Sequence, residues 1–232
     1  MAGMNLVILT GAGISAESGL ATFRDLGGIW SQVRLEEVAT PEAFAADPGR
    51  VQGFYNARRA QLRTVAPNPA HAALARLDAA WDRGDFLLVT QNVDDLHERA
   101  GSRRLHHMHG ELRRARCLEC RADSPWQDDI TLASACPACG AMGRLRPHVV
   151  WFGEVPLGME RIEAALEACD MLVSIGTSGR VWPAAGFAAA VRGRARTLEI
   201  NLEASDGTSI FHETRHGPAG RLVPEWVEEM LR

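Results

Sequence analysis

The sequence lacks the features that would point to a membrane, to secretion or to nucleic acid. No apolar run approaches the roughly 20 residues that a membrane-spanning helix needs. The first residues contain neither the basic stretch nor the cleavage site of a signal peptide. The formal net charge is -4 and aromatic residues make up only 6% of the chain, whereas binding of nucleic acid needs a basic surface and stacking rings. We therefore expect a cytoplasmic monomer that binds neither membranes nor nucleic acid.

Cysteine is scarce, yet four of the five cysteines form two pairs. Cys117 and Cys120 make up the first pair, Cys136 and Cys139 the second, and both have the spacing C-x-x-C. In a reducing compartment such pairs indicate a zinc site rather than disulfides. Four thiolates fill the coordination shell of zinc, so we predict a structural Zn²⁺ without a catalytic role. Cys169 stands alone, and we expect it to be a buried structural residue.

Four short apolar runs, each followed by small or polar residues, divide the chain. They cover residues 6–9, 86–89, 171–175 and 198–200. Continuous apolar runs of this length are typical of strands buried on both faces of a parallel sheet. Because ligands bind beyond the carboxyl ends of such strands, the small and polar residues that follow the runs should share one ligand-binding edge.

Helical patterns lie between these runs. Asn68 can cap a helix that has Pro69 at its first position. Further helices are predicted over residues 159–168 and 224–231. Strands that alternate with helices predict an α/β fold with a doubly wound parallel sheet.

Two segments break this alternation and predict a second, smaller lobe. Residues 30–66 have a helical pattern without a buried-strand run, and residues 116–144 contain the paired cysteines with few apolar residues. We interpret the first as a helical module and the second as a zinc-binding ribbon. The Rossmann-like domain would then comprise residues 1–29, 67–115 and 145–232.

The first candidate ligand site is the glycine pair Gly11-x-Gly13, directly after the first apolar run. Glycines at such a position let the backbone approach a diphosphate, which backbone N–H groups bind. The same pair could also form a tight turn that binds nothing. A third glycine is missing, because Ala16 stands in its place, and no acidic strand end follows some twenty residues later. A hydride-transferring dehydrogenase is therefore disfavoured.

Polar residues also follow the second run. Asn92 and Asp94 could hydrogen-bond an amide group of a ligand, or they could cap the helix that follows. Histidines stand at 106, 107 and 109, and one of them could act as a base because histidine titrates near neutral pH. The residue pattern alone does not select one of the three.

The segment 146–154 is apolar and aromatic. It could be a core strand, or it could be an exposed edge that pairs with a peptide substrate.

Taken together, these motifs resemble the sirtuin family over about residues 6–227. The matching segments are GAGIS, AESG, TFR, TQNVD, HMHGEL, the two C-x-x-C pairs, RPHVVWFGE, GTS and NLE, in that order. The resemblance implies a Rossmann-type domain with a small lobe, one structural zinc and NAD as a consumed cosubstrate. It implies transfer of an acyl group from a lysine side chain to ADP-ribose, with release of nicotinamide and O-acyl-ADP-ribose. Alternatives that use the same site are a protein mono-ADP-ribosyltransferase and a non-catalytic NAD sensor.

The resemblance also implies roles for single residues. His109 would be the general base. The acyl-lysine substrate would contact Val150, Trp151, Phe152 and Gly153. NAD would be bound by residues from six segments, namely Gly11, Ala12 and Gly13; Ala21, Phe23, Arg24 and Trp30; Gln91, Asn92, Val93 and Asp94; Gly176, Thr177 and Ser178; Asn201, Leu202 and Glu203; and Ala219.

Tyr55 and Arg58 concern the choice of acyl group. They lie three residues apart in a helical stretch and therefore share one helix face. A phenol and an arginine fork can bind a carboxylate together, although the pair could also be a packing tyrosine beside a surface arginine. Together with VVWFGE, the pair resembles the class III branch of the family, which removes acidic acyl groups. We therefore predict that acetyl-lysine and succinyl-lysine proteins or peptides are the substrates.

Overall fold

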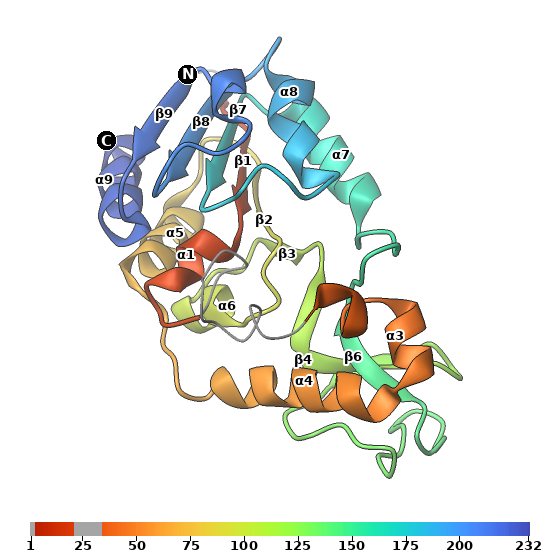
Figure 1. Ribbon diagram of the computed structural model, residues 1–232. Coiled ribbons are helices and arrows are strands. Elements are labelled where there is room, and N and C mark those ends of the chain that lie inside the picture. Colours follow the sequence, from red (N-terminus) through yellow and green to blue (C-terminus); the bar gives the residue numbers. More distant parts are fainter. Residues whose placement is uncertain (1–2, 21–33) are drawn as a thin grey trace.

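A six-stranded sheet with the order β3-β2-β1-β7-β8-β9 forms the centre of the larger domain (Figure 1). The computed structural model describes residues 3–20 and 34–232. All neighbouring strands of this sheet pair in parallel, and the order reverses at β1, as in doubly wound nucleotide-binding domains. The strands are β1 (Leu6–Thr10), β2 (Phe86–Thr90), β3 (Leu105–His107), β7 (Met171–Ile175), β8 (Arg196–Asn201) and β9 (Glu213–His216). The four predicted apolar runs are four of these strands.

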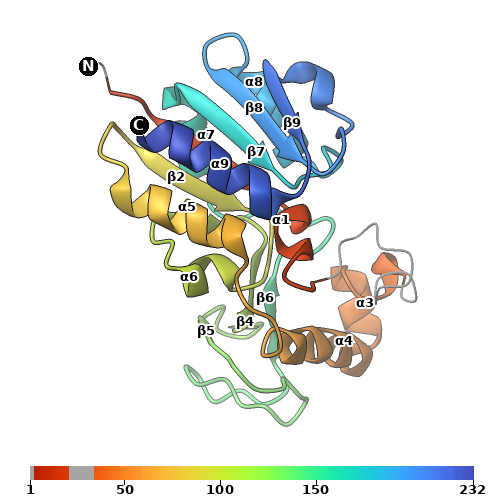
Figure 2. The same cartoon turned by 90° about the vertical axis from the view of Figure 1, so that its left-hand side faces the viewer.

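Helices cover both faces of the sheet, which explains why its central strands are continuously apolar. Every residue of β1 is buried. Its side chains alternate between two cores, since Leu6 and Ile8 pack into one cluster and Val7 and Leu9 into the other. The first cluster lies under α5 (Pro69–Ala80) and α9 (Ala219–Leu231), which Figure 2 shows side by side on one face. The second lies under α7 (Met159–Ala168) and α8 (Phe187–Val191).

The predicted helices are confirmed with one correction. The Asn68 side chain accepts hydrogen bonds from the first turn of α5, and Pro69 is the first residue of that helix. The last helix begins at Ala219 rather than at Pro224, so the predicted start was wrong. Its buried residues, which include Leu222 and Trp226, lie on both sides of the proline. Burial of this apolar stripe therefore outweighs the one helical hydrogen bond that a proline cannot make.

The smaller lobe combines short helices with a three-stranded antiparallel sheet of order β5-β4-β6. Figure 1 shows α4, β4 and β6 together below the large sheet. The sheet includes residues 110–115 and 145–149, which the sequence analysis had assigned to the larger domain. The elements are the 3-10 helix η1 (Leu35–Glu37), α3 (Pro41–Ala46), α4 (Pro48–Gln61), β4 (Gly110–Cys117), β5 (Asp123–Pro125) and β6 (Leu145–Val149).

Short helical elements complete the fold. They are α1 (Ala12–Ala16), α6 (Leu96–Ala100), η2 (Ala184–Gly186) and η3 (Thr208–Ile210). Within the described ranges, the helices are too short or too polar for any of them to cross a bilayer.

Candidate active site

The carboxyl ends of four neighbouring strands bring the predicted NAD-binding segments together. In the sheet register Thr10 lies beside both Thr90 and Ile175. The N–H of Gly11 donates to the carbonyl of Ile175 at 3.0 Å, and the N–H of Gln91 donates to the carbonyl of Thr10 at 2.9 Å. The expected ligand-binding edge is therefore present, and hydrogen bonds between adjacent loops hold it together.

The glycines at this edge allow two loops to touch. A Cβ on Gly13 would lie 2.7 Å from the Cα of Gly176, and a Cβ on Gly176 would lie 2.4 Å from the N of Ile14. The backbone of Gly176 is left-handed, with φ +63°. The N–H of Gly13 donates to the Gly176 carbonyl at 2.9 Å. Contact between protein backbones therefore already requires glycine at these positions, before any diphosphate binds.

Asn92 and Asp94 converge on Ser15, a residue of α1. The Asn92 side-chain amide donates to the Ser15 hydroxyl and to the Gly11 carbonyl, both at 3.1 Å. The Ser15 hydroxyl donates to the carboxylate of Asp94 at 3.0 Å, and the other carboxylate oxygen accepts from the N–H of Leu96 at 3.1 Å. Burial raises the pKa of Asp94. Asp94 thus accepts from the first N–H of α6, just before which Asp95 is the N-cap residue, and its contact with a ligand stays a prediction.

A buried histidine completes the hydrogen bonding of Ser15. The N–H of Asn68 donates to Nδ1 of His71 at 3.3 Å, which leaves the proton of the ring on Nε2, 3.4 Å from the Ser15 hydroxyl. Burial lowers the pKa of His71 to about 4, so the ring is neutral. Neither Ser15 nor His71 was predicted from the sequence to belong to the candidate site. The signal that could have identified them is a polar residue on the buried face of a helix.

The structure separates the three histidines that the sequence could not distinguish. Nε2 of His106 lies 2.8 Å from the Leu157 carbonyl, and both ring nitrogens of His107 are hydrogen-bonded. Nδ1 of His109 lies 3.1 Å from the carbonyl of Gln91, to which it must donate. Burial lowers the pKa of His109. The ring is therefore neutral at neutral pH, with the lone pair on Nε2, which no described residue hydrogen-bonds.

Gly110, the residue after His109, has a backbone conformation and a close backbone contact that favour glycine. Gly110 has φ +78°, and a Cβ there would lie 2.1 Å from the carbonyl oxygen of His148. Glycine is therefore required at this position, because the chain passes close to the backbone of β6.

Tyr55 lies deep between α4 and the segment that follows β6. Its exposed fraction is 3%, and the indole N–H of Trp151 donates to its hydroxyl oxygen at 2.9 Å. Burial raises the pKa of Tyr55 to about 12. Arg58 is half-buried, with its Nε atom buried. Loss of hydration lowers its pKa, while the phenol of Tyr55 and the negative charge of Asp94 oppose this. Arg58 is therefore not a surface arginine, and its charge lies within electrostatic reach of Asp94.

The four predicted substrate residues differ in exposure: one is buried, one is half-buried and two are exposed. Phe152 is 52% exposed and Gly153 is exposed with φ +88°. Val150 is half-buried, and its N–H donates to the carbonyl of His109 at 2.9 Å. Trp151 is only 3% exposed, and the guanidinium of Arg146 stacks 3.4 Å from the centre of its ring. Trp151 is therefore buried between Tyr55 and Arg146, and its contact with a substrate stays a prediction.

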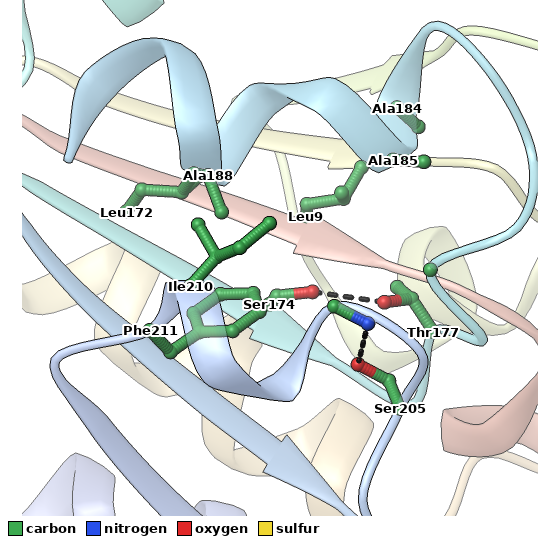
Figure 3. A pocket seen from close by; sticks show the side chains of 12 residues that line it. Leu9, Leu172, Ser174, Thr177, Ala184, Ala185, Ala188, Ser205, Ile210 and Phe211 are labelled. Atoms are coloured by element: carbon green, nitrogen blue, oxygen red, sulfur yellow. Dashed lines mark hydrogen bonds between the residues drawn. The ribbon is translucent and has the colours of Figure 1, made fainter.

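The loop after β7 lies between the glycine loop that follows β1 and the end of β8. The Asn201 side chain donates to the carbonyl of Thr177 at 2.7 Å, and the Thr177 hydroxyl lies 2.9 Å from that of Ser174. Figure 3 shows this pair beside a small pocket of about 20 Å³. That volume suits about one water molecule, not a nucleotide.

The other predicted nucleotide contacts differ in exposure. Ser178 is half-buried, Leu202 and Glu203 are exposed, and Ala219 is buried at the first position of α9. Val93, Ala12 and Gln91 are half-buried. Ala21, Phe23, Arg24 and Trp30 lie outside the described residues.

The four paired cysteines form a compact cluster. Their sulfur atoms all lie within 4.8 Å of one another. Sγ of Cys117 is 3.8 Å from that of Cys139, and Sγ of Cys120 is 3.8 Å from that of Cys136. Sulfurs bound at about 2.3 Å to a tetrahedral zinc lie about 3.8 Å apart, so the cluster fits this ion. The sequence prediction of a four-thiolate site agrees with this geometry.

Comparisons with known proteins agree with these observations. The Sir2 family model matches residues 11–183. A Caulobacter vibrioides protein named NAD-dependent protein deacylase is 55% identical over 231 residues, which cover 98% of this chain and 97% of that protein. A protein of the same name from Escherichia coli K12 is 53% identical over 232 residues, covering 98% of this chain and 82% of that one.

Solved structures show the same relationship. A Sir2 homolog in complex with NAD has a TM-score of 0.88 at 40% identity, covering 98% of this chain and 90% of that chain. A Sir2 protein with a deacetylated p53 peptide and 3'-O-acetyl-ADP-ribose has a TM-score of 0.80 at 26% identity, covering 97% and 92%. The similarity thus extends over nearly the whole chain in both sequence and fold, and this chain belongs to the Sir2 family.

Proposed function

We propose that the protein is an NAD-dependent protein-lysine deacylase. The observation that supports this most directly is the neutral ring of His109, whose Nε2 is left free by the bond from Nδ1 to Gln91. Gln91 is the first residue after β2, and Asn92 and Asp94 follow it in the same loop. A base beside a nucleotide-binding edge is what acyl transfer to the ribose of NAD requires. The curated relatives described above are named for this activity.

In the proposed reaction the acyl oxygen of the substrate amide attacks C1' of the nicotinamide ribose, and the bond to nicotinamide breaks. Asn92 and Asp94 would hold the carboxamide of the leaving nicotinamide. Nε2 of His109 would then accept a proton from the ribose hydroxyls, so that the 2'-oxygen can attack the carbon of the cationic imidate. Water completes the release of free lysine and O-acyl-ADP-ribose. Exclusion of bulk water would protect the imidate until that step.

The remaining NAD contacts are part of the same proposal. The glycine loop 11–13 and the loop 176–178 would face the diphosphate, and residues 201–203 with Ala219 would face the adenosine. Ala21, Phe23, Arg24 and Trp30 remain predicted contacts. The paired cysteines would hold one structural zinc, and they favour a reducing compartment such as the cytoplasm, where we expect a monomer.

Product analysis tests the reaction. Incubation of the enzyme with NAD and a panel of acyl-lysine peptides should give free lysine peptide, nicotinamide and O-acyl-ADP-ribose, all detectable by mass spectrometry. A peptide or protein that gains the mass of ADP-ribose, without O-acyl-ADP-ribose, would instead identify a mono-ADP-ribosyltransferase. Binding of NAD without any product would identify a sensor.

We further propose that the enzyme removes succinyl as well as acetyl groups. Trp151 donates to the oxygen of Tyr55, so the phenol proton of Tyr55 is free to donate to an acyl carboxylate. Arg58 lies one helical turn away and is a half-buried cation. A half-buried cation and a phenolic donor together would offset the cost of burying a carboxylate.

Replacement of either Tyr55 or Arg58 should change the preference of the enzyme between acyl groups. We expect Tyr55→Phe and Arg58→Met each to lower kcat/KM for a succinyl-lysine peptide by about 10- to 100-fold, the usual value of a hydrogen bond to a charged group. Deacetylation should change only a few-fold. Arg63→Met is a matched control, because Arg63 follows α4 and its side chain is 57% exposed. Unchanged desuccinylation together with reduced deacetylation would contradict the assignment.

A further inference from the structure

His107, the last residue of β3, contacts two groups that can only accept hydrogen bonds. Nδ1 lies 2.9 Å from the carbonyl oxygen of Asn92, and Nε2 lies 2.7 Å from a carboxylate oxygen of Glu98. A neutral imidazole has a single N–H and can satisfy only one of these acceptors. The charged imidazolium, with two N–H groups, satisfies both. The geometry therefore selects the protonated ring.

The surroundings of His107 are mostly acidic. Glu98 on α6 and Glu111 on β4 approach the ring, and Asp94 lies within electrostatic reach in the loop between β2 and α6. His97 on α6 adds no positive charge, because burial holds its pKa well below the ordinary value. Burial by itself would lower the pKa of His107, but the hydrogen bond and charge of Glu98, the Asn92 carbonyl and Glu111 outweigh it and raise this pKa.

His107 and His109 act on adjacent peptide groups. Nδ1 of His109 bonds the carbonyl of Gln91, and Nδ1 of His107 bonds the carbonyl of Asn92. The two rings thus hold two consecutive carbonyls of one segment. The Asn92 side chain, on that segment, reaches Gly11 and Ser15 across the strand edge.

We propose that His107, held by Glu98, is a positioning residue that fixes the 91–94 segment for NAD. The inference rests on the proposed function, because it assumes that this segment binds the nicotinamide end of NAD. His107 does not need to touch NAD, since it acts through the backbone of Asn92. Its expected effect is on the affinity for NAD rather than on the chemical step.

This proposal predicts that KM for NAD depends on pH. Since the pKa of His107 is raised, the ring is fully charged below the ordinary histidine pKa of about 6.5. As the pH rises through the raised pKa, the ring loses a proton and one of its two hydrogen bonds. KM for NAD should therefore rise on the alkaline side, while kcat at saturating NAD stays nearly constant.

Steady-state kinetics over pH with the zinc-loaded enzyme test this. We expect His107→Asn to raise KM for NAD roughly tenfold below the transition, because it loses a charge-assisted hydrogen bond, and to abolish the alkaline rise. Glu98→Gln keeps an acceptor but removes the charge, so it should move the rise to lower pH. His106→Asn is the matched control, since the neighbouring His106 bonds a single carbonyl, that of Leu157. It should leave the pH profile unchanged.

Two further measurements keep the test decisive. NMR titration of ring-labelled wild-type enzyme should assign His107 a pKa above the ordinary value even if the variant does not fold. Asn92→Ala should raise KM for NAD, and if it does not, the proposed role of the 91–94 segment in NAD binding fails. If Asn92→Ala has this effect while His107→Asn and Glu98→Gln leave KM and its pH profile unchanged, the inference about His107 fails.

A metal ion is the competing occupant of this cluster, because ligand atoms of Glu98, His107 and Glu111 lie within 4.8 Å of one another. The 2.7 Å bond to Glu98 already uses Nε2, which a metal would need. Addition of Zn²⁺ or Mn²⁺ to the zinc-loaded enzyme should not change KM for NAD. A change that His107→Asn removes would overturn the ion-pair assignment.

Discussion

Replacing His109 by asparagine is expected to slow deacylation by about 100-fold or more, the usual loss when a general base is removed. Asparagine can still donate a hydrogen bond to the Gln91 carbonyl, so the local backbone should keep its position. Attack of the acyl oxygen on C1' does not require a base, and exchange of labelled nicotinamide into NAD should therefore fall much less than product formation. Measurement of both rates on one peptide separates the two steps.

The pH profile of the wild-type enzyme should show the titration of His109. Burial lowers the pKa of His109, and only the neutral ring accepts a proton. The rate of deacylation at saturating substrates should therefore fall as the pH drops through a value below the ordinary histidine pKa of about 6.5. His109→Asn should lack this acidic limb. Full activity in this variant would remove His109 from the mechanism.

Loss of the zinc site is expected to have the second largest effect. The ribbon has a small core of its own, made of Ala115, Cys117, Ile130, Cys136 and Leu145. Zinc binding in such small modules supplies on the order of 10 kcal/mol, so Cys136→Ala should unfold the ribbon.

Unfolding of the ribbon should also disturb α4, the helix that we propose binds the acyl group. The side chains of Gln52 and Arg59 donate to the carbonyls of Leu145 and Leu112, both at 2.7 Å. Asn56 accepts from the N–H of Ile130 at 2.9 Å. These bonds tie α4, which carries Tyr55 and Arg58, to the ribbon. Activity on both acyl groups should therefore be lost.

Zinc content, circular dichroism and the thermal midpoint measure this effect. Cys169→Ala is the control, because Cys169 is buried against α7 and α8 in the large domain, away from the cluster. That variant should keep one zinc per chain and most of its activity. If Cys136→Ala retains wild-type activity and stability without zinc, the metal has no structural role.

Strands were predictable where burial on both faces made them apolar. β1, β2 and β7 are buried at every position, and their runs are visible in the sequence. β4 has the sequence GELRRARC and alternates buried with half-exposed residues. Its arginines face solvent and partners in the ribbon, so the segment has no apolar run. Its pairing with β6 depends on contacts distant in the sequence.

The candidate site, like the fold, has parts that the sequence predicts and parts that it does not. The sequence by itself determined the zinc ligands and the segments that meet at the strand edge, because C-x-x-C spacing and strand-end glycines are local requirements. Only the tertiary structure decided what each histidine does. The proton of an imidazole is placed by its acceptors, and the carbonyls of Leu157, Asn92 and Gln91 that bond His106, His107 and His109 come from distant segments. We therefore interpret the three neighbouring histidines as one structural residue, His106, one charged residue proposed to position the backbone, His107, and one neutral residue proposed as the base, His109.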